Sequence, residues 1–215
     1  MVTAAESEPS LFDLLETWLE RTPYTDLDDF SFFSKYRECV QGMLDGDRDA
    51  IAANEMIDEA AKSEQLAELE KTRAHFQSLL EESAHNALVA RGDRRLSYKA
   101  TQAALFITLY QDEPMFTLPY RVLELLQDID EQLVAWRYRH ALMVHRMLGS
   151  KIGTGGSSGY NYLRATASRH KVFTDLFNLN TFLIPKTRLP ALPDSIRSEL
   201  AFHGESSTAR ASPSP

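Results

Sequence analysis

The sequence predicts an all-α fold, and three observations support this prediction. Apolar residues recur every three or four positions in several segments, as they do on one face of a helix. Residues 49–90 contain no Pro or Gly and are rich in Ala, Glu, Leu, Gln and Lys, which are strong helix formers. No segment of useful length alternates apolar and polar residues, as a half-buried strand would. We therefore expect a helical bundle with a long helical hairpin arm and a glycine-rich lid loop.

The first helical segments lie in the N-terminal part of the chain. In LFDLLETWLER (11–21), apolar residues recur at helical spacing, and Pro23 follows as a stop. A second apolar pattern runs from Phe30 to Met43 and closes in LDGDRD. The uninterrupted run 49–90 then forms either one long exposed helix or a helical hairpin arm.

Two later helices carry clear end signals. RRLSYKATQAALFITLYQDEP (94–114) contains Ser97 as an N-cap, and its terminal proline ends the helix. The next helix begins near Pro119 and extends to about residue 148. Gly149 then provides a C-terminal stop, because glycine tolerates the left-handed conformation that ends many helices.

The rest of the chain divides into short elements and tails. We expect a shorter helix at 168–180 and an extended, proline-containing segment at 185–193. Residues 10–190 are expected to form a single helical domain. Residues 1–9 are expected to be a disordered tail, and 191–215 an extended or disordered C-terminal tail, since its end has the composition of disorder.

The composition indicates a soluble protein in a reducing compartment. Cys39 is the one cysteine, so the chain cannot build a disulfide framework. The N-terminus shows no basic region followed by an apolar run, so we expect no signal peptide. No apolar stretch approaches the roughly 18 residues that span a bilayer. We therefore expect a cytoplasmic protein that does not enter a membrane.

The charge is unevenly distributed along the chain. The net charge is −8, yet residues 1–70 carry 18 acids and 5 bases, so the remainder is net positive. Between Arg137 and Lys171 there are seven bases and no acid. Such a field suits a small anionic ligand such as a carboxylate or a phosphate, whereas nucleic acid is a poorer candidate because the whole chain is acidic. The alternative is a solvated basic face that balances the acidic half.

His140 is the candidate metal ligand. Steps of three or four residues along the long helix place it in one apolar stripe, with Ile129, Leu133, Trp136, Met143 and Met147. On spacing alone, the residue is either a satisfied core histidine or an axial haem ligand, since one imidazole in an apolar wall is what a porphyrin iron requires. No zinc-binding pattern is present. His75 and His85 lie in the polar run and are expected to be solvated.

The segment GTGGSSGYNYLR (153–164) is the candidate ligand-binding loop. It lacks the Gly-Lys-Ser/Thr end of a P-loop, and Ser158 stands where a dinucleotide fingerprint needs its third glycine. Two interpretations remain. The segment is either a mobile lid whose hydroxyl and backbone N–H groups close on a polar ligand, or a long flexible turn between helices.

Four segments together resemble the tryptophan 2,3-dioxygenase family. They are WRYRHALMVHRMLGSKIGTGGSSGYNYLR (136–164), KVFTDLFNLNTFLIP (171–185), WLERTP (18–23) and RRLSYKATQAALFITLYQDEP (94–114). The resemblance covers about residues 11 to 190. It implies an all-α, haem-dioxygenase-like bundle that is usually a homotetramer. It also implies cleavage of the indole 2,3-bond of L-tryptophan by dioxygen, giving N-formylkynurenine, which is the first step of the kynurenine pathway.

The resemblance also implies roles for particular residues. The histidine that follows W-R-x-x is the axial ligand of haem b iron in the family, and it maps to His140. The threonine of the G-T-G-G loop contacts the ammonium and carboxylate of the substrate. That residue maps to Thr154, with Gly153 and Gly155 on either side. The glycines would let the backbone fold over the zwitterion.

The family also places distal-pocket residues on a segment N-terminal to the part seen here. We expect that segment to be absent from this chain, so no distal catalytic residue is assigned. The leading hypothesis is a tryptophan-cleaving haem dioxygenase whose distal part comes from another chain or is lost in this gene model. The alternative is an inactive truncated isoform that binds haem weakly or associates with a full-length homologue. A helical adaptor that uses the 49–90 arm is a third interpretation.

Overall fold

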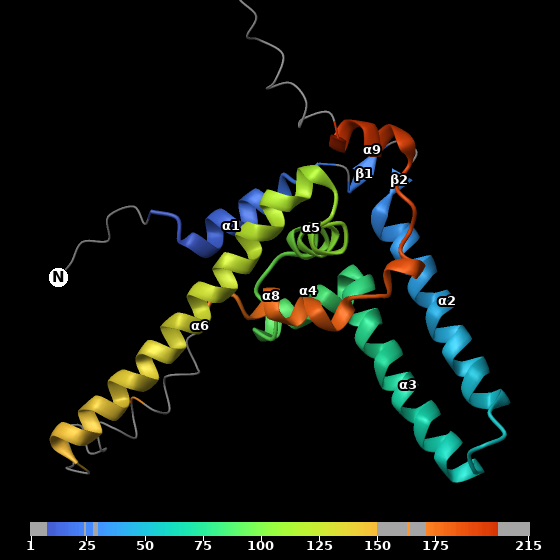
Figure 1. Ribbon diagram of the computed structural model, residues 1–215, viewed down its shortest axis with the longest axis horizontal. Helices are drawn as coiled ribbons and strands as arrows, with labels where there is room; N and C mark the ends of the chain where they lie inside the picture. Colours follow the sequence, from blue (N-terminus) through green and yellow to red (C-terminus); the bar gives the residue numbers. More distant parts are fainter. Residues whose placement is uncertain (1–7, 24, 28–29, 150–162, 164–170, 202–215) are drawn as a thin grey trace, which may run out of the picture.

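The computed structural model describes residues 8–23, 25–27, 30–149, 163 and 171–201, and in these it is helical (Figure 1). The prediction of an all-α fold is therefore confirmed. The main α-helices are α1 (Leu11–Glu20), α2 (Phe32–Ala53), α3 (Glu59–Leu80), α4 (Glu82–Arg91), α5 (Tyr98–Leu109) and α6 (Pro114–Leu148). They are followed by α8 (Thr174–Asn178), the 3-10 turns η1 (Leu179–Phe182) and η2 (Lys186–Arg188), and α9 (Asp194–Ala201). A minimal antiparallel ladder pairs β1 (Asp26–Leu27) with β2 (Phe30–Ser31).

The helix ends follow local side-chain chemistry. Ser10 and Asp13 form a capping box at α1, in which the Ser10 hydroxyl accepts from the Asp13 N–H at 3.2 Å. The predicted N-cap Ser97 is confirmed, since its hydroxyl accepts from the Ala100 N–H at 3.2 Å. Gly149 ends α6 with φ 60°, a conformation that favours glycine, so the predicted stop is also confirmed.

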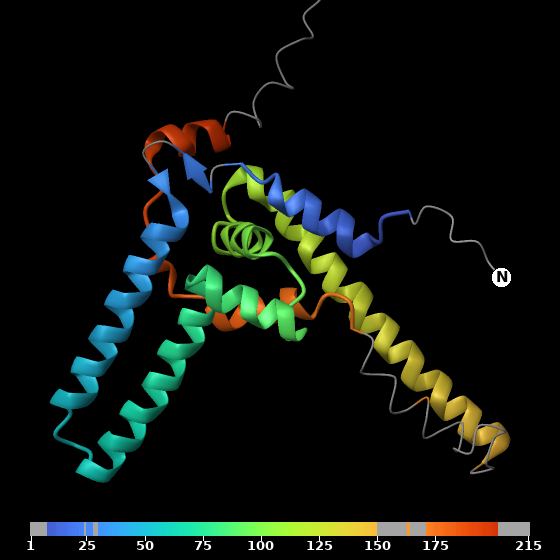
Figure 2. The ribbon, with the colours of Figure 1, turned by 180° about the vertical axis from the view of Figure 1, so that it is seen from behind.

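Helix α5 is the centre of the core. Figures 1 and 2 both show it nearly end-on, with the other helices around it. Its buried side chains lie on all sides rather than on one stripe, as expected for a fully enclosed helix. Phe106 is the aromatic hub: its ring lies 4.7 Å from Phe32, 5.0 Å from Tyr110 and 5.0 Å from Phe116. This cluster joins α2, α5 and the start of α6.

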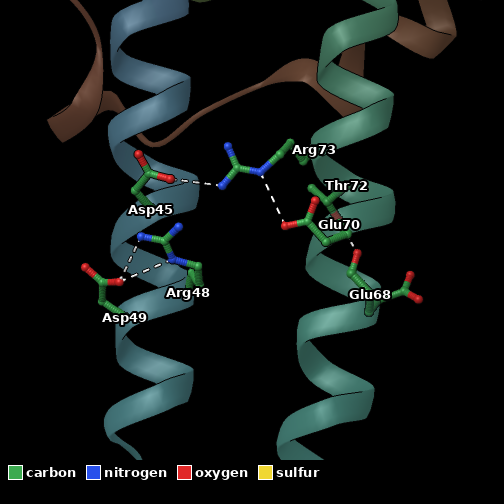
Figure 3. A network of polar contacts seen from close by, with 7 residues as sticks. All are labelled: Asp45, Arg48, Asp49, Glu68, Glu70, Thr72 and Arg73. Atoms are coloured by element: carbon green, nitrogen blue, oxygen red, sulfur yellow. Dashed lines mark hydrogen bonds and ion pairs between the residues drawn. The ribbon is translucent and has the colours of Figure 1, made fainter.

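Helices α2 and α3 form the expected hairpin arm, which points away from α5 (Figure 1). The arm was expected within 49–90, but its first helix already begins at Phe32, and the chain leaves helical geometry at 54–58 and again at Glu81. Ion pairs at the surface join its two helices and lie along them (Figure 3). Arg73 donates to Asp45 across the hairpin at 3.0 Å and lies 3.5 Å from Glu70 on its own helix. Exposed pairs of this kind contribute about 0–1 kcal/mol each.

Two expectations about the second half of the chain need correction. Helix α6 begins at Pro114 rather than near Pro119, which lies inside the helix, where its missing N–H removes one backbone hydrogen bond. The helix expected at 168–180 is, among the described residues, only α8 followed by η1. The segment 185–193, expected to be extended, contains the 3-10 turn η2.

The expectation of an extended or disordered tail over 191–215 is wrong for residues 194–201, which form α9. This short helix packs on α6, and Ile196 is buried. The segment before it is also attached to the core, because the Tyr110 hydroxyl donates to the Pro190 carbonyl at 2.6 Å. Within the described residues, no helix is long and apolar enough to cross a membrane.

Candidate functional site

Helix α6 presents two different faces along its length. Toward the core it buries Phe116, Leu123, Leu126 and Asp130. Beyond Asp130 the helix extends away from α5 (Figures 1 and 2). From Leu125 onward it exposes a stripe of large apolar side chains, which we call the α6 stripe: Leu125, Ile129, Leu133, Trp136, Met143 and Met147. Exposed apolar surface of this extent marks a binding surface.

His140 lies on the α6 stripe and is half-buried. The Trp136 indole stacks on its ring, with centroids 5.6 Å apart and planes 12° from parallel. Among the described residues, neither ring nitrogen of His140 has a hydrogen-bond partner. The prediction that His140 shares one helix face with apolar residues therefore agrees with the structure. This arrangement leaves an imidazole nitrogen available to a metal centre that approaches an apolar wall.

An open hollow lies beside His140 on the same helix. Its lining residues include Leu125, Ile129, Leu133 and Trp136 from the α6 stripe. Polar side chains at its edge come from Asp128, Gln132 and Arg139. Among the described residues, this lining comes from α6 alone.

The expected substrate-contact residues Thr154, Gly153 and Gly155 lie outside the described residues. The assignment of these three residues remains a prediction. Of the basic stretch 137–171, the described part includes Arg139 on α6 and Lys171, whose ammonium group lies 5.1 Å from the Phe177 ring centroid.

Two aspartates hold the chain where it returns to the core after residue 170. On α6, one oxygen of the buried Asp130 accepts from the N–H groups of Val172 and Phe173, at 2.9 and 3.0 Å. Asp175 accepts from two N–H groups just before α5, those of Arg95 at 2.7 Å and of the next residue at 2.6 Å. We call these two carboxylates the return clamp. It attaches the segment at 172–175 both to α6 and to the start of α5.

The expectation that His85 is solvated is wrong. It is fully buried, and its Nε2 donates to the Leu96 carbonyl at 2.9 Å. Its Nδ1 accepts from Arg94 Nη1 at 2.9 Å. Burial is the main cause that lowers the pKa of His85. His75 is exposed, but it is not simply solvated, since its ring stacks on Phe182 at 4.6 Å.

Sequence reasoning missed the return clamp and the buried histidine. Nothing in the local pattern of either segment distinguishes these residues, because their partners are 9 to 80 residues away along the chain. Among the described residues there is no group of three or more His, Cys, Asp or Glu side chains placed to hold a metal ion. A single axial ligand of the kind expected for His140 does not need such a group.

Comparison with known proteins decides the family. The sequence model of tryptophan 2,3-dioxygenase matches residues 1–183, most of the chain. The chain belongs to the tryptophan 2,3-dioxygenase family.

Named relatives agree with this assignment. The tryptophan 2,3-dioxygenase of Bdellovibrio bacteriovorus is 47% identical over 197 residues, which cover 92% of this chain and 55% of the relative. Those of Alteromonas mediterranea and Mayetiola destructor are 43% and 48% identical, covering 92% and 93% of this chain and 55% and 51% of the relatives. The chain thus spans about half the length of the curated relatives it matches.

Proposed function

We propose that this tryptophan 2,3-dioxygenase family chain takes part in the oxidative cleavage of the indole 2,3-bond of L-tryptophan by dioxygen, which gives N-formylkynurenine. Family membership supports the reaction class. The observation in the structure that carries the proposal is His140, half-buried on the α6 stripe with no hydrogen-bond partner among the described residues. Tryptophan degradation through the kynurenine pathway follows from the same proposal.

The residues around His140 fit haem b. Trp136 stacks on one face of the imidazole and restricts the orientation of its ring. Leu133, Met143 and Met147 offer exposed apolar surface on the same stripe, which suits a large apolar macrocycle. When bound, haem supplies the redox-active iron for dioxygen chemistry, and the protein supplies binding and orientation. The role of His140 in this proposal is to donate one nitrogen to that iron.

The substrate side of the proposal rests on the glycine-rich segment. Thr154 would donate its hydroxyl to the polar end of the amino acid, and Gly153 and Gly155 would let backbone N–H groups approach it. The return clamp supports this role indirectly, because Asp130 and Asp175 hold the chain soon after that segment ends. A homotetramer, association with a full-length homologue and a cytoplasmic location stay predictions.

A haem titration tests the cofactor part. The purified chain is titrated with haem and followed by its Soret absorption, and the His140→Ala variant is compared with it. His75→Ala is the matched control, since His75 lies on α3, away from the α6 stripe. Retention of haem by the wild type and His75→Ala, with most of it lost in His140→Ala, is the expected result. Equal retention by all three proteins would exclude His140 as the ligand.

A turnover assay tests the catalytic part. The haem-loaded chain is incubated with L-tryptophan under reducing, aerated conditions, alone and after co-expression with a full-length homologue. Formation of N-formylkynurenine is the expected result, and Thr154→Ala is expected to raise KM more than it lowers kcat. Haem binding without turnover under either condition would reject the proposed reaction. The proposal that the chain binds haem would remain.

A further inference from the structure

A hollow beside the C-terminal half of α3 gathers basic and hydrogen-bonding side chains from three parts of the chain. It is lined by Lys71, His75, Ser78, Arg94, Asn178 and Thr181, among others. These six side chains come from α3, from the turn before α5, and from the end of α8 with η1. None of these residues belongs to the α6 stripe.

Arg94 is the central group of this hollow. Its Nη1 donates to the Ser78 carbonyl at 2.6 Å and to Nδ1 of His85 at 2.9 Å. Its Nη2 donates to the Ser78 hydroxyl at 2.8 Å. All three acceptors are neutral, and among the described residues this half-buried guanidinium forms no ion pair with a carboxylate. Its positive charge is therefore not neutralised by direct contact.

Two N–H groups of Arg94 remain for a ligand. A guanidinium carries five N–H donors, and the contacts above use three of them. The Nε–H and one Nη2–H have no acceptor among the described residues. Nε and Nη2 are neighbours on the guanidinium plane, where two parallel N–H groups match the oxygen pair of a carboxylate or phosphate. Because the guanidinium is already half-buried, part of the free-energy cost of removing water from it was met on folding. Binding of an anion therefore costs less in desolvation.

The hydroxyl groups of the hollow are already oriented by the backbone. The Thr181 hydroxyl donates to the Asn178 carbonyl at 2.6 Å, so it accepts from His75 Nε2 at 3.0 Å. The Ser78 hydroxyl donates to the His75 carbonyl at 2.6 Å, so it accepts from Arg94. These contacts fix the rim of the hollow before any ligand arrives.

The remaining lining supplies a second charge and an apolar floor. Lys71 is exposed at the rim and forms an ion pair with Glu68 at 2.9 Å. Phe182 is buried beneath the hollow, with the Arg94 guanidinium 5.4 Å from its ring centroid. Asp93 also lines the hollow, but its carboxylate is paired with an arginine of α4 at 3.0 Å.

We propose that this hollow binds a small anion that carries a carboxylate or phosphate group. Two of its oxygens accept from the Nε–H and Nη2–H groups of Arg94, and Lys71 supplies the second positive charge. A ligand bound there connects α3 to the segment that begins at Asn178. The proposal does not depend on haem binding or on tryptophan cleavage.

Isothermal titration calorimetry on the full chain tests the proposal. Sodium phosphate and sodium benzoate are the probes, at constant ionic strength, against wild type, Arg94→Lys and Lys71→Gln. Lys62→Gln is the matched control, because Lys62 is also on α3 and also pairs with a glutamate three residues earlier, yet it does not line the hollow. Arg94→Lys keeps the charge but loses the paired N–H groups, so we expect at least about tenfold weaker binding. Lys71→Gln should weaken binding about two- to fivefold, and Lys62→Gln should leave it unchanged.

The outcomes separate the possibilities. Saturable binding of phosphate alone, or of benzoate alone, supports the site and identifies the ligand chemistry. Absence of saturable binding by both probes overturns the proposal, as does equal affinity in the wild type and Arg94→Lys. If circular dichroism shows that Arg94→Lys does not fold, the affinities of Lys71→Gln and Lys62→Gln are compared instead to test the proposal. Equal affinity in those two variants then overturns the proposal.

Discussion

Replacement of Asp130 tests the return clamp. One carboxylate oxygen accepts from two backbone N–H groups, and the side chain is only 1% exposed. In Asp130→Ala, Val172 and Phe173 lose these acceptors inside the protein. A hydrogen bond to a charged group contributes about 1.5–3 kcal/mol, so the two bonds together predict a loss of about 3–6 kcal/mol in the free energy of unfolding. This loss is a large part of the total stability of a typical domain, about 5–15 kcal/mol.

The asparagine variant separates hydrogen bonding from charge. Since a single oxygen of Asp130 accepts both N–H groups, the amide oxygen of Asp130→Asn can take its place and keep both bonds. The amide nitrogen then takes the place of the other oxygen, Oδ1, which is buried without a hydrogen-bond partner among the described residues. A buried donor without an acceptor costs about 1–3 kcal/mol, so we expect this variant to lose about that much. Asp128→Ala is the control, because Asp128 is exposed on the same helix, and such changes alter stability by about 0.5 kcal/mol or less.

Equilibrium urea unfolding, monitored by circular dichroism, gives the four free energies of unfolding. The wild type and Asp128→Ala are expected to be the most stable and close together, Asp130→Asn to be less stable, and Asp130→Ala to be the least stable. If Asp130→Ala lies within 1 kcal/mol of Asp128→Ala, the two backbone contacts at 172–173 do not stabilise the fold, and the reasoning is wrong.

Three further predictions concern the core, a cap and pH. Phe106→Ala should lower the free energy of unfolding by about 3–5 kcal/mol, because it empties the centre of the aromatic cluster; a loss below 1 kcal/mol would contradict this. Ser97→Ala should lower it by about 1–2 kcal/mol, since the hydroxyl caps α5 and donates to Glu20 at 2.6 Å; an unchanged urea midpoint would argue against the cap. Burial lowers the pKa of His85, so the unfolded state binds more protons below the ordinary value of 6.5. The free energy of unfolding should therefore fall as the pH decreases from 7 to 5, and this slope should be smaller in His85→Gln; equal slopes would refute the assignment.

Helical periodicity and end signals predicted most of the fold. The cap at Ser97 and the stop at Gly149 lie where the sequence placed them, because both act through local backbone geometry. The hairpin arm was also predictable, since a long run of helix formers must fold back or extend into solvent. Its bounds were not, because the break at 54–58 contains no Pro or Gly.

The remaining features depend on contacts between distant residues. His85 lies in a polar stretch, and it is buried because residues 94–96 return over it. Asp130 is one of several acids on α6. It differs from Asp128 because it accepts hydrogen bonds from the backbone N–H groups of residues 172–173, which are distant in the sequence. Helix α9 has a polar sequence whose order depends on packing against α6. Tertiary contacts of this kind override local propensity.

A nitrogen of His140 is proposed to coordinate haem iron from the α6 stripe. The most direct measurement is the resonance Raman spectrum of the ferrous, haem-loaded chain, prepared with ordinary and with ¹⁵N-labelled histidine. We predict an iron–nitrogen stretching band that shifts on labelling, persists in His75→Ala and disappears in His140→Gly. The same labelled shift in the spectrum of His140→Gly would contradict the claim.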